Sequence, residues 1–328
     1  MKTALKPLEI YSLVAPDLER VEEELASYAS SPIEPVAVIA RHLLGAGGKR
    51  VRPALLLLTS RMLGAVPPAA IRLGAVVELI HNATLVHDDV IDGSDTRRGR
   101  PSANAHWGNP MTVLAGDWLY MQSFAVALGE RNFDVLSTLV DITRKMVEGE
   151  LLQLTLVGRS DVTEDQLLDI ADRKTASLFA GCVRLPAIVA GRTPAEADRY
   201  ALIGRSLGMA FQLVDDLLDL TSTEEALGKP TASDLRDGKV TLPVYYALAS
   251  GSDPARSRVE RVLLERDFRS VSPEEIVDSV RDADGVGRTR ALAARYAARA
   301  LGILENLPPS IYRDAISSIP EFILNRRA

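Results

Sequence analysis

The stretch GAVVELIHNATLVHDDVIDGSDTRR, residues 74–98, joins a long apolar run to four aspartates and two arginines. An α-helix turns about 100° per residue, so Asp88 and Asp92 fall almost on one line with His81. Like charges this close together raise the free energy unless a positive partner holds them. The stretch therefore predicts an apolar helix over residues 68–92 that presents a row of carboxylates to a cation.

The remainder of the chain has the same helical periodicity, and it contains no alternating strand pattern of useful length. Prolines precede several apolar runs, where a proline in the first helical turn removes no hydrogen bond. Only 5% of the residues are aromatic, so the core consists mainly of Leu, Val, Ile and Ala. We predict one all-α domain, residues 1–328, a bundle of about a dozen helices. The expected helices are 17–29, 35–45, 53–64, 68–92, 110–129, 133–157, 163–191, 195–221, 240–250, 254–265, 273–283, 288–305 and 309–326.

Composition excludes several classes of protein. The formal net charge of −6 argues against a nucleic-acid-binding protein, whose surface would be basic. Cys182 is the single cysteine, so we expect neither a disulfide framework nor a thiolate zinc site. The first ten residues, MKTALKPLEI, lack the apolar core of a signal peptide, and we identify no transmembrane segment. These features predict a cytoplasmic protein.

A second group of carboxylates occurs in FQLVDDLLDL, residues 211–220. It repeats the DDxxD spacing of Asp88, Asp89 and Asp92, and apolar residues again separate the acidic ones. One such motif is more often an exposed acidic helix face than a metal site, but two motifs in helical context favour metal binding. Mg²⁺ fits, because it takes one or two carboxylates and completes its shell with water and substrate phosphates. The second group consists of Asp215, Asp216 and Asp219, with Gln212 one turn earlier.

Basic residues that could bind phosphate occur in compact groups. The segment GAGGKRVRP, residues 45–53, is glycine-rich, so its backbone N–H groups can approach an anion beside its lysine and arginines. Taken singly, each basic group is more often solvated surface, and GGKR is not a Walker A loop. Their occurrence together with two aspartate groups is what predicts a diphosphate site. The candidates are Lys49, Arg50, Arg52, Arg97, Arg98, Lys174 with its neighbour Thr175, Lys229 and Lys239.

The segments GGKRVRP, HNATLVHDDVIDGSDTRRGRPSANAHWG, FQLVDDLLD and GKPTASDLRDGKVTLP, in this order, resemble the trans-type polyprenyl diphosphate synthases. The resemblance spans about residues 35–250. The C-terminal YRDAISSIPEFILNRR is similar to the long-chain members, such as octaprenyl, heptaprenyl and solanesyl diphosphate synthases. The resemblance implies the isoprenoid synthase fold around a central elongated cavity, a homodimer, and Mg²⁺-dependent condensation of an allylic diphosphate with isopentenyl diphosphate.

The same resemblance implies a role for each matching residue. Two positions depart from the family pattern: Ala232 stands where relatives usually have glycine, and Asp237 where they usually have glutamate. Metal ions and catalysis would depend on Asp88, Asp89, Asp92, Asp215, Asp216 and Asp219, with Lys174 also catalytic. Isopentenyl diphosphate would be bound by Lys49, Arg50, Arg52, His81 and Arg98. The allylic diphosphate would be bound by Arg97, Lys174, Thr175, Gln212, Lys229 and Lys239.

The implied reaction is ionisation, condensation and elimination, in which the metal and the basic residues stabilise the departing diphosphate. Product length would depend on Ile80, Ala83 and Thr84, which precede the first aspartates on their helix. A bulky aromatic residue four or five places before the aspartates stops the chain early in this family. Small Ala83 therefore predicts a long all-trans product of roughly six or more isoprene units, although Ala83 could simply pack against a neighbouring helix.

Three other functions remain open on the sequence alone. The chain could make a product of only geranylgeranyl or farnesyl length. A terpene cyclase shares the helical fold but has no use for a second basic pocket, and its second metal motif normally mixes Asn, Ser and Glu. A non-catalytic partner subunit of a heteromeric synthase would tend to lose aspartates or arginines, and none is missing here. A long apolar product would also imply transient membrane contact for its release.

Overall fold

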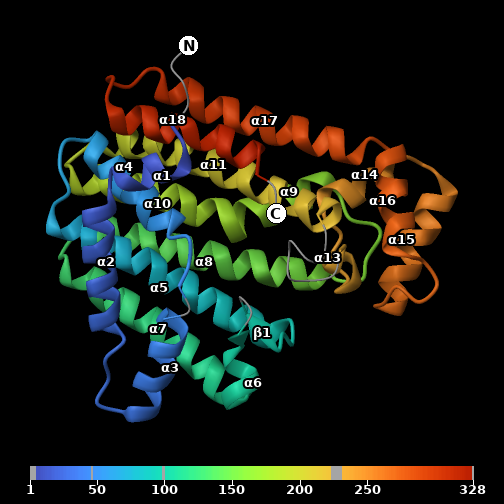
Figure 1. The fold of residues 1–328 in the computed structure, drawn as a ribbon, viewed down its shortest axis with the longest axis horizontal. Helices are drawn as coiled ribbons and strands as arrows, with labels where there is room; N and C mark the ends of the chain where they lie inside the picture. The colour runs from blue at the N-terminus through green and yellow to red at the C-terminus, as the bar shows by residue number, and fades with distance from the viewer. Residues whose placement is uncertain (1–4, 46, 98–99, 223–230, 327–328) are drawn as a thin grey trace. The chain divides into compact units, whose positions relative to one another are not determined.

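The protein is described here from a computed structural model, which covers residues 5–45, 47–97, 100–222 and 231–326 (Figure 1). The described chain is almost entirely helical, which confirms the all-α prediction. The helices of the first half are α1 (Pro7–Ser12), α2 (Ala15–Tyr28), α3 (Glu34–Gly45), α4 (Val51–Met62), α5 (Pro68–Ile91), α6 (Ala103–Trp107), α7 (Asn109–Gly129) and α8 (Phe133–Leu156). Those of the second half are α9 (Glu164–Ala171), a π-helix η1 (Asp172–Ala176), α10 (Ser177–Val189), α11 (Pro194–Thr221), α13 (Ser233–Arg236), α14 (Leu242–Ala249), α15 (Asp253–Glu265), α16 (Pro273–Asp282), α17 (Gly285–Leu304) and α18 (Ile311–Leu324).

Local sequence explains where many helices begin. Prolines occupy the first turn of helices such as α5, α7 and α16, where their missing N–H has no helical partner. At α16, Ser272 and Glu275 form a capping box, in which each side chain accepts a hydrogen bond from the other residue's backbone N–H. The predicted boundaries of the long helices are accordingly close to those observed.

Several short elements were absent from the prediction. Helices α1, α6 and α13 are too short to show a period. Strands β1 (Thr96–Arg97) and β2 (Arg100–Pro101) pair antiparallel in a two-residue ladder. The single helix predicted over residues 163–191 is instead α9, η1 and α10 in succession. The π-turn, DRKTA, contains no proline or glycine that would mark it in the sequence.

The chain divides into two compact units, each made of three segments. The first comprises Met1–Thr143, Ala180–Ala201 and Leu307–Ser318, and the second comprises Arg144–Phe179, Leu202–Asn306 and Ile319–Ala328. A single domain over residues 1–328 stays a prediction.

In the first unit, α5 is the central element. It packs against α2, α4 and α7, and most of its side chains are buried. Leu73, Leu79 and Ile80 are completely buried on α5, as is Leu57 on α4. Gly74 allows α2 to approach closely, since a Cβ at this position would lie 2.9 Å from a methyl group of Val21. This apolar packing fixes the helix that carries the first aspartates.

Helix α5 is also the one helix in the described part of the chain that is long and apolar enough, by length and composition, to cross a membrane. Within its most apolar window, 72% is buried inside the structure. That burial is what the core helix of a compact protein requires.

In the second unit, α14 packs against α15, α16 and α17, shown at the yellow-to-red end of the ribbon in Figure 1. The core there is aliphatic, with Val244, Val259, Val262 and Ile276 buried. Helix α9 packs against both α14 and η1, so the same core supports the π-helix that carries two predicted site residues.

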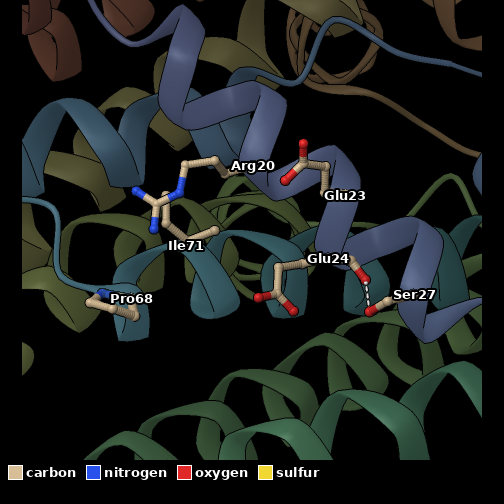
Figure 2. A pocket seen from close by; sticks show the side chains of 6 residues that line it. All are labelled: Arg20, Glu23, Glu24, Ser27, Pro68 and Ile71. Carbon is tan, nitrogen blue, oxygen red and sulfur yellow. Dashed lines mark hydrogen bonds between the residues drawn. The ribbon is translucent and has the colours of Figure 1, made fainter.

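Figure 2 shows a surface pocket of about 280 Å³ between α2 and the beginning of α5. Its lining residues are Arg20, Glu23, Glu24, Ser27, Pro68 and Ile71. None of these is a predicted site residue.

Candidate functional site

The first aspartate group lies at the C-terminal end of α5, in the first unit. Asp92 caps the helix, and its N–H donates to the carbonyl oxygen of Asp88 at 2.8 Å. Asp88 is half-buried, Asp92 is exposed and Asp89 is buried. The group is therefore graded from core to solvent, as expected for carboxylates at the rim of an apolar helix.

Asp89 is paired with Arg97, which lies on β1 just beyond the helix. The Arg97 guanidinium donates from Nε to Asp89 Oδ1 at 2.9 Å and makes a second, shorter contact to the same oxygen. Burial raises the pKa of Asp89, and the hydrogen bonds from Arg97 offset part of that rise. The structure thus brings together a predicted metal ligand and a predicted ligand of the allylic diphosphate.

Arg50, a predicted ligand of isopentenyl diphosphate, is surrounded by carboxylates. It adopts a left-handed backbone conformation with φ 48° immediately before α4. Its guanidinium donates to Glu78 at 2.6 Å and to Glu22 at 2.9 Å. Glu78 is buried on α5 and Glu22 belongs to α2, so this arginine ties three helices together. The pairing favours a structural role, and its contact with substrate stays a prediction.

Lys49, Arg52 and His81 also belong to the first unit. Lys49 is exposed, and its carbonyl oxygen accepts a hydrogen bond from the hydroxyl of Tyr11. Arg52 is half-buried in the first turn of α4, and His81 is half-buried on α5, the helix against which α4 packs. Arg98, the fifth predicted ligand of isopentenyl diphosphate, lies outside the described residues, as does Lys229 on the allylic side.

The second aspartate group lies near the end of α11, in the second unit. Asp215 is exposed, Asp216 is half-buried and Asp219 is buried. Asp219 accepts a hydrogen bond from the Ser233 hydroxyl at 2.7 Å and one from the N–H of Asp234 at 3.3 Å. This buried carboxylate therefore fastens the start of α13 to α11.

Ala232, which departs from the family pattern, precedes α13 in a left-handed conformation with φ 56°. Its N–H donates to the carbonyl oxygen of Asp219 at 2.8 Å. Glycine adopts such a backbone without the steric cost of a Cβ atom, which gives a physical reason for glycine at this place in relatives. Here alanine adopts the same conformation, so the attachment of α13 is retained.

Asp216 is the most electrostatically strained carboxyl of the site. Burial and the neighbouring carboxylates of Asp234, Asp215 and Asp219 raise its pKa well above the ordinary value, and a hydrogen bond from Gln212 offsets part of that effect. Asp234 was not among the predicted site residues. Its signal was its place in TASDLRDGK, one residue after the serine that binds Asp219, but only the folded chain brings it to the cluster.

The side chains of the two aspartate groups are suited to bind a hard divalent cation. All the donors are carboxylate oxygens, which Mg²⁺ prefers, and the excess negative charge around Asp216 would be neutralised by such an ion. Within the described ranges, no three histidine, cysteine or carboxylate side chains are grouped closely enough to hold a metal ion. Asp89 is instead engaged by Arg97, and Asp219 by Ser233.

Lys174 and Thr175 lie on the π-helix η1. The Lys174 ammonium pairs with Glu150 and donates to the Gln153 amide oxygen at 2.5 Å. The Thr175 hydroxyl donates to the amide oxygen of Gln212 at 2.6 Å, and the Gln212 amide nitrogen donates to Asp216 at 2.8 Å. Thr175 and Gln212 are thus linked by hydrogen bonds to a predicted metal ligand, and Lys174 is the chain neighbour of Thr175.

Lys239 follows α13 and is half-buried, and its backbone N–H donates to the carbonyl oxygen of Asp234 at 2.8 Å. The loop lysine that the structure describes is therefore held close to the second aspartate group through the backbone. The family resemblance assigns both Lys239 and Lys174 to the allylic diphosphate, and for Lys239 this assignment stays a prediction.

Arg326, near the end of the chain, also contacts the second aspartate group. Its guanidinium donates to Asp215 at 3.0 Å, and its central carbon lies 4.9 Å from the ring centre of Phe211, one turn earlier on α11. The contact was not predicted, because 111 positions separate the two residues in the sequence. In this structure Arg326 supplies a positive charge at a predicted metal ligand.

The predicted chain-length residues lie on α5 before the first aspartates. Ile80 and Ala83 are completely buried in the first unit, and Thr84 is half-buried with its hydroxyl donating to the His81 carbonyl oxygen at 2.7 Å. Their assignment to product length stays a prediction.

Comparison with known proteins shows the family of the chain. Residues 34–280 match the family described as polyprenyl synthetase. The chain is 38% identical to heptaprenyl diphosphate synthase component 2 of Geobacillus stearothermophilus, over 98% of this chain and 99% of that one. It is 36% identical to the short chain isoprenyl diphosphate synthase of Methanothermobacter thermautotrophicus, over 94% of each chain. A crystal structure of a polyprenyl synthase from Caulobacter crescentus, complexed with calcium and isoprenyl diphosphate, is 33% identical, with complete coverage of both chains and a TM-score of 0.93.

Proposed function

The chain belongs to the polyprenyl synthetase family and is an enzyme, a prenyl diphosphate synthase of the isoprenoid synthase fold, and from this premise we propose that it joins an allylic prenyl diphosphate to isopentenyl diphosphate with the help of Mg²⁺. The observation that carries the proposal is the chain of hydrogen bonds from Thr175 through Gln212 to Asp216, which lies among the carboxylates of Asp215 and Asp219. Lys174 is the chain neighbour of Thr175 on η1. Ammonium, hydroxyl and amide donors beside several carboxylates suit a diphosphate that arrives with a divalent cation.

The chain's own residues explain how the allylic diphosphate would be held for ionisation. Lys174 supplies a positive charge, and Thr175 and Gln212 supply polar groups linked to Asp216. Mg²⁺, when bound by the aspartates, supplies charge that stabilises the departing diphosphate. No protein nucleophile is required. The allylic C–O bond breaks as diphosphate departs, and the double bond of isopentenyl diphosphate forms a new C–C bond to the allylic carbon. The condensed cation then loses a proton to the departed diphosphate.

Isopentenyl diphosphate would be held by residues of the first unit. Lys49 and Arg52 flank the start of α4, and His81 lies on the helix that packs against it. Two cationic side chains and an imidazole can bind a diphosphate through charge-assisted hydrogen bonds. His81 is therefore assigned to phosphate binding and not to proton abstraction.

We further propose a long all-trans product. Ala83 supports it, because a small side chain just before the first aspartates leaves more room below them than an aromatic ring would. The name of the heptaprenyl relative points the same way. The short chain relative, at nearly the same identity, supports the rival assignment of a geranylgeranyl or farnesyl product.

A second copy of the chain is the partner we propose for an exposed apolar stripe on α7. Leu114, Met121 and Leu128 recur every seven residues and are 64%, 61% and 61% exposed. A row of large exposed apolar side chains indicates a protein–protein contact more often than a surface that stays in solvent. Met121→Glu should shift a dimer to monomer in sedimentation velocity, whereas a dimer that withstands this change would use another surface.

We also propose that the enzyme acts in the cytoplasm, because both of its diphosphate substrates are water-soluble. A long polyprenyl tail is apolar, so product release would require transient contact with a membrane surface. Sedimentation of the enzyme with phospholipid vesicles, with and without bound product, measures this contact.

The decisive experiment is to incubate the purified chain alone with Mg²⁺, farnesyl diphosphate and isopentenyl diphosphate, and to separate the products by chromatography. We expect a ladder of products ending beyond geranylgeranyl diphosphate. A stop at geranylgeranyl would overturn the long product but not the activity. Absence of turnover would favour a partner subunit of a heteromeric synthase, a reading supported by the word "component" in the heptaprenyl relative's name.

A further inference from the structure

Helix α8 approaches the π-helix η1 unusually closely, and a glycine makes this approach feasible. A Cβ atom at Gly149 would lie 2.7 Å from Cβ of Arg173 and 2.9 Å from Cγ of Lys174. It would also lie 3.1 Å from the backbone nitrogen of Lys174. Real Cβ atoms essentially never come this close, so a side chain here would push the π-helix away. The backbone of η1 is therefore placed against α8 at the position of Lys174.

The next residue on α8, Glu150, forms the ion pair with Lys174. Its side chain is 15% exposed and that of Lys174 is 25% exposed, so solvent screens the pair less than it screens a surface pair. Gln153, one turn further along α8, accepts a second hydrogen bond from the same ammonium at 2.5 Å. A lysine ammonium has three N–H donors, so one remains for a phosphate oxygen.

An ordered ammonium is an advantage at a diphosphate site. A free lysine side chain loses rotamer entropy when it binds substrate, whereas an ammonium that is already ordered loses less. On the other side of η1, Thr175 is fixed through Gln212 to Asp216. Adjacent residues of one π-turn are thus oriented by two different helices, α8 and α11.

We propose that Glu150 is a positioning residue, which orders the Lys174 ammonium in advance for the allylic diphosphate. The identity of that ligand rests on the proposed function, whereas the contact itself is independent of it. Glu150 acts through Lys174 and touches no reacting atom.

The first test measures the amine and needs no activity. The folded protein is treated with a limiting amine-acetylating reagent, and mass spectrometry quantifies modification of Lys174 against that of exposed Lys145 on α8. Glu150→Gln should accelerate acetylation of Lys174 about fivefold, because a charge-assisted bond is lost. Unchanged acetylation in a variant with native circular dichroism would overturn the proposal.

Matched variants separate positioning from general effects. Glu148→Gln is the control, since Glu148 lies on the same helix but pairs with Arg173 at 2.6 Å and Arg144 at 2.9 Å. It should leave acetylation of Lys174 unchanged. Glu150→Asp keeps the charge on a shorter stem and should restore part of the protection. If Glu150→Gln fails to fold, Gln153→Leu should give a smaller acceleration of about twofold, and no acceleration there would count against the proposal.

Kinetics supply the functional readout. Glu150→Gln should lower kcat about tenfold, because the ammonium is no longer aligned with the leaving group. KM for the allylic diphosphate should stay nearly constant, since removal of a carboxylate also favours anion binding. A uniform loss of active enzyme, with no partial recovery in Glu150→Asp, would indicate a structural role only. If the parent chain makes no prenyl product, the proposed function fails, and the acetylation test still decides the contact.

Discussion

At the scale of single residues, Asp216 shows how closely spaced carboxylates affect the stability of the fold when no cation is bound. Three neighbouring carboxylates and burial raise its pKa well above that of a free aspartate. Folding therefore strengthens proton binding at this group. Such a group stabilises the fold below its unfolded pKa, and the contribution is lost as the pH rises through the folded pKa. As the pH rises from the unfolded pKa of Asp216 to its folded pKa, the free energy of unfolding of the metal-free protein should therefore decrease.

Asp216→Asn removes the ionisable carboxyl, so the loss of stability with rising pH should disappear. The asparagine keeps an oxygen that can accept a hydrogen bond from Gln212. We expect the metal-free variant to be more stable than the parent at about pH 8, and equally stable at about pH 3, where both forms are uncharged. Urea denaturation at a series of pH values with a chelator present measures the difference. A variant that is less stable than the parent at the higher pH would show that the repulsion is relieved in another way.

Cys182 provides a second prediction at the residue scale. The thiol is completely buried, and burial raises its pKa to about 12. Since the thiolate is the reactive form, a thiol reagent should modify the native protein about a hundredfold more slowly than the unfolded chain near pH 8. Colour development with an aromatic disulfide, with and without urea, tests this; rapid reaction in buffer alone would contradict the burial.

At the scale of elements, Arg50 holds α2, α4 and α5 together through Glu22 and Glu78. Arg50→Ala would leave the carboxylate of Glu78, whose side chain is 4% exposed, without its partner. Loss of one member of a buried ion pair costs about 3 kcal/mol or more. Thermal or urea unfolding measures this. Glu22→Ala, at the exposed end of the network, should cost less than about 1 kcal/mol, and equal effects of both variants would refute the assignment.

Most elements were predictable from sequence and the remainder were not, for identifiable reasons. The helix expected over residues 110–129 is α7, because Pro110 marks its first turn and a long apolar pattern follows. The π-turn at Lys174 has no proline or glycine to mark it in the sequence. Helix α13 is too short to show an apolar period. Among the candidate site residues, the aspartates are predicted from their DDxxD spacing, and their role as metal ligands stays a prediction. The contacts of Glu150, Asp234 and Arg326 join separate segments, so no local pattern announces them.

At the scale of the whole molecule, product length is the property that tests the helical architecture. Ala83→Phe places an aromatic ring on α5 just before the first aspartates. We expect the main product to shorten by roughly two or more isoprene units, at a stability cost of about 1–3 kcal/mol for overpacking. Chromatography of the reaction products measures the length.

Ala75→Phe is the matched control, since Ala75 is equally buried on the same helix but two turns further from the aspartates. It should cost comparable stability and leave the product length nearly as in the parent. Equal product lengths in the Ala83 variant and the parent would show that another residue closes the tunnel.

The contact between Arg326 and Asp215 has a practical consequence for handling the enzyme. If Asp215 binds a metal ion as proposed, the guanidinium that neutralises it would compete with an added divalent ion. An affinity tag joined two residues after Arg326 would therefore begin close to a group that is expected to affect ion uptake. Titrations with magnesium or manganese salts should use protein tagged at the opposite terminus, or with the tag removed.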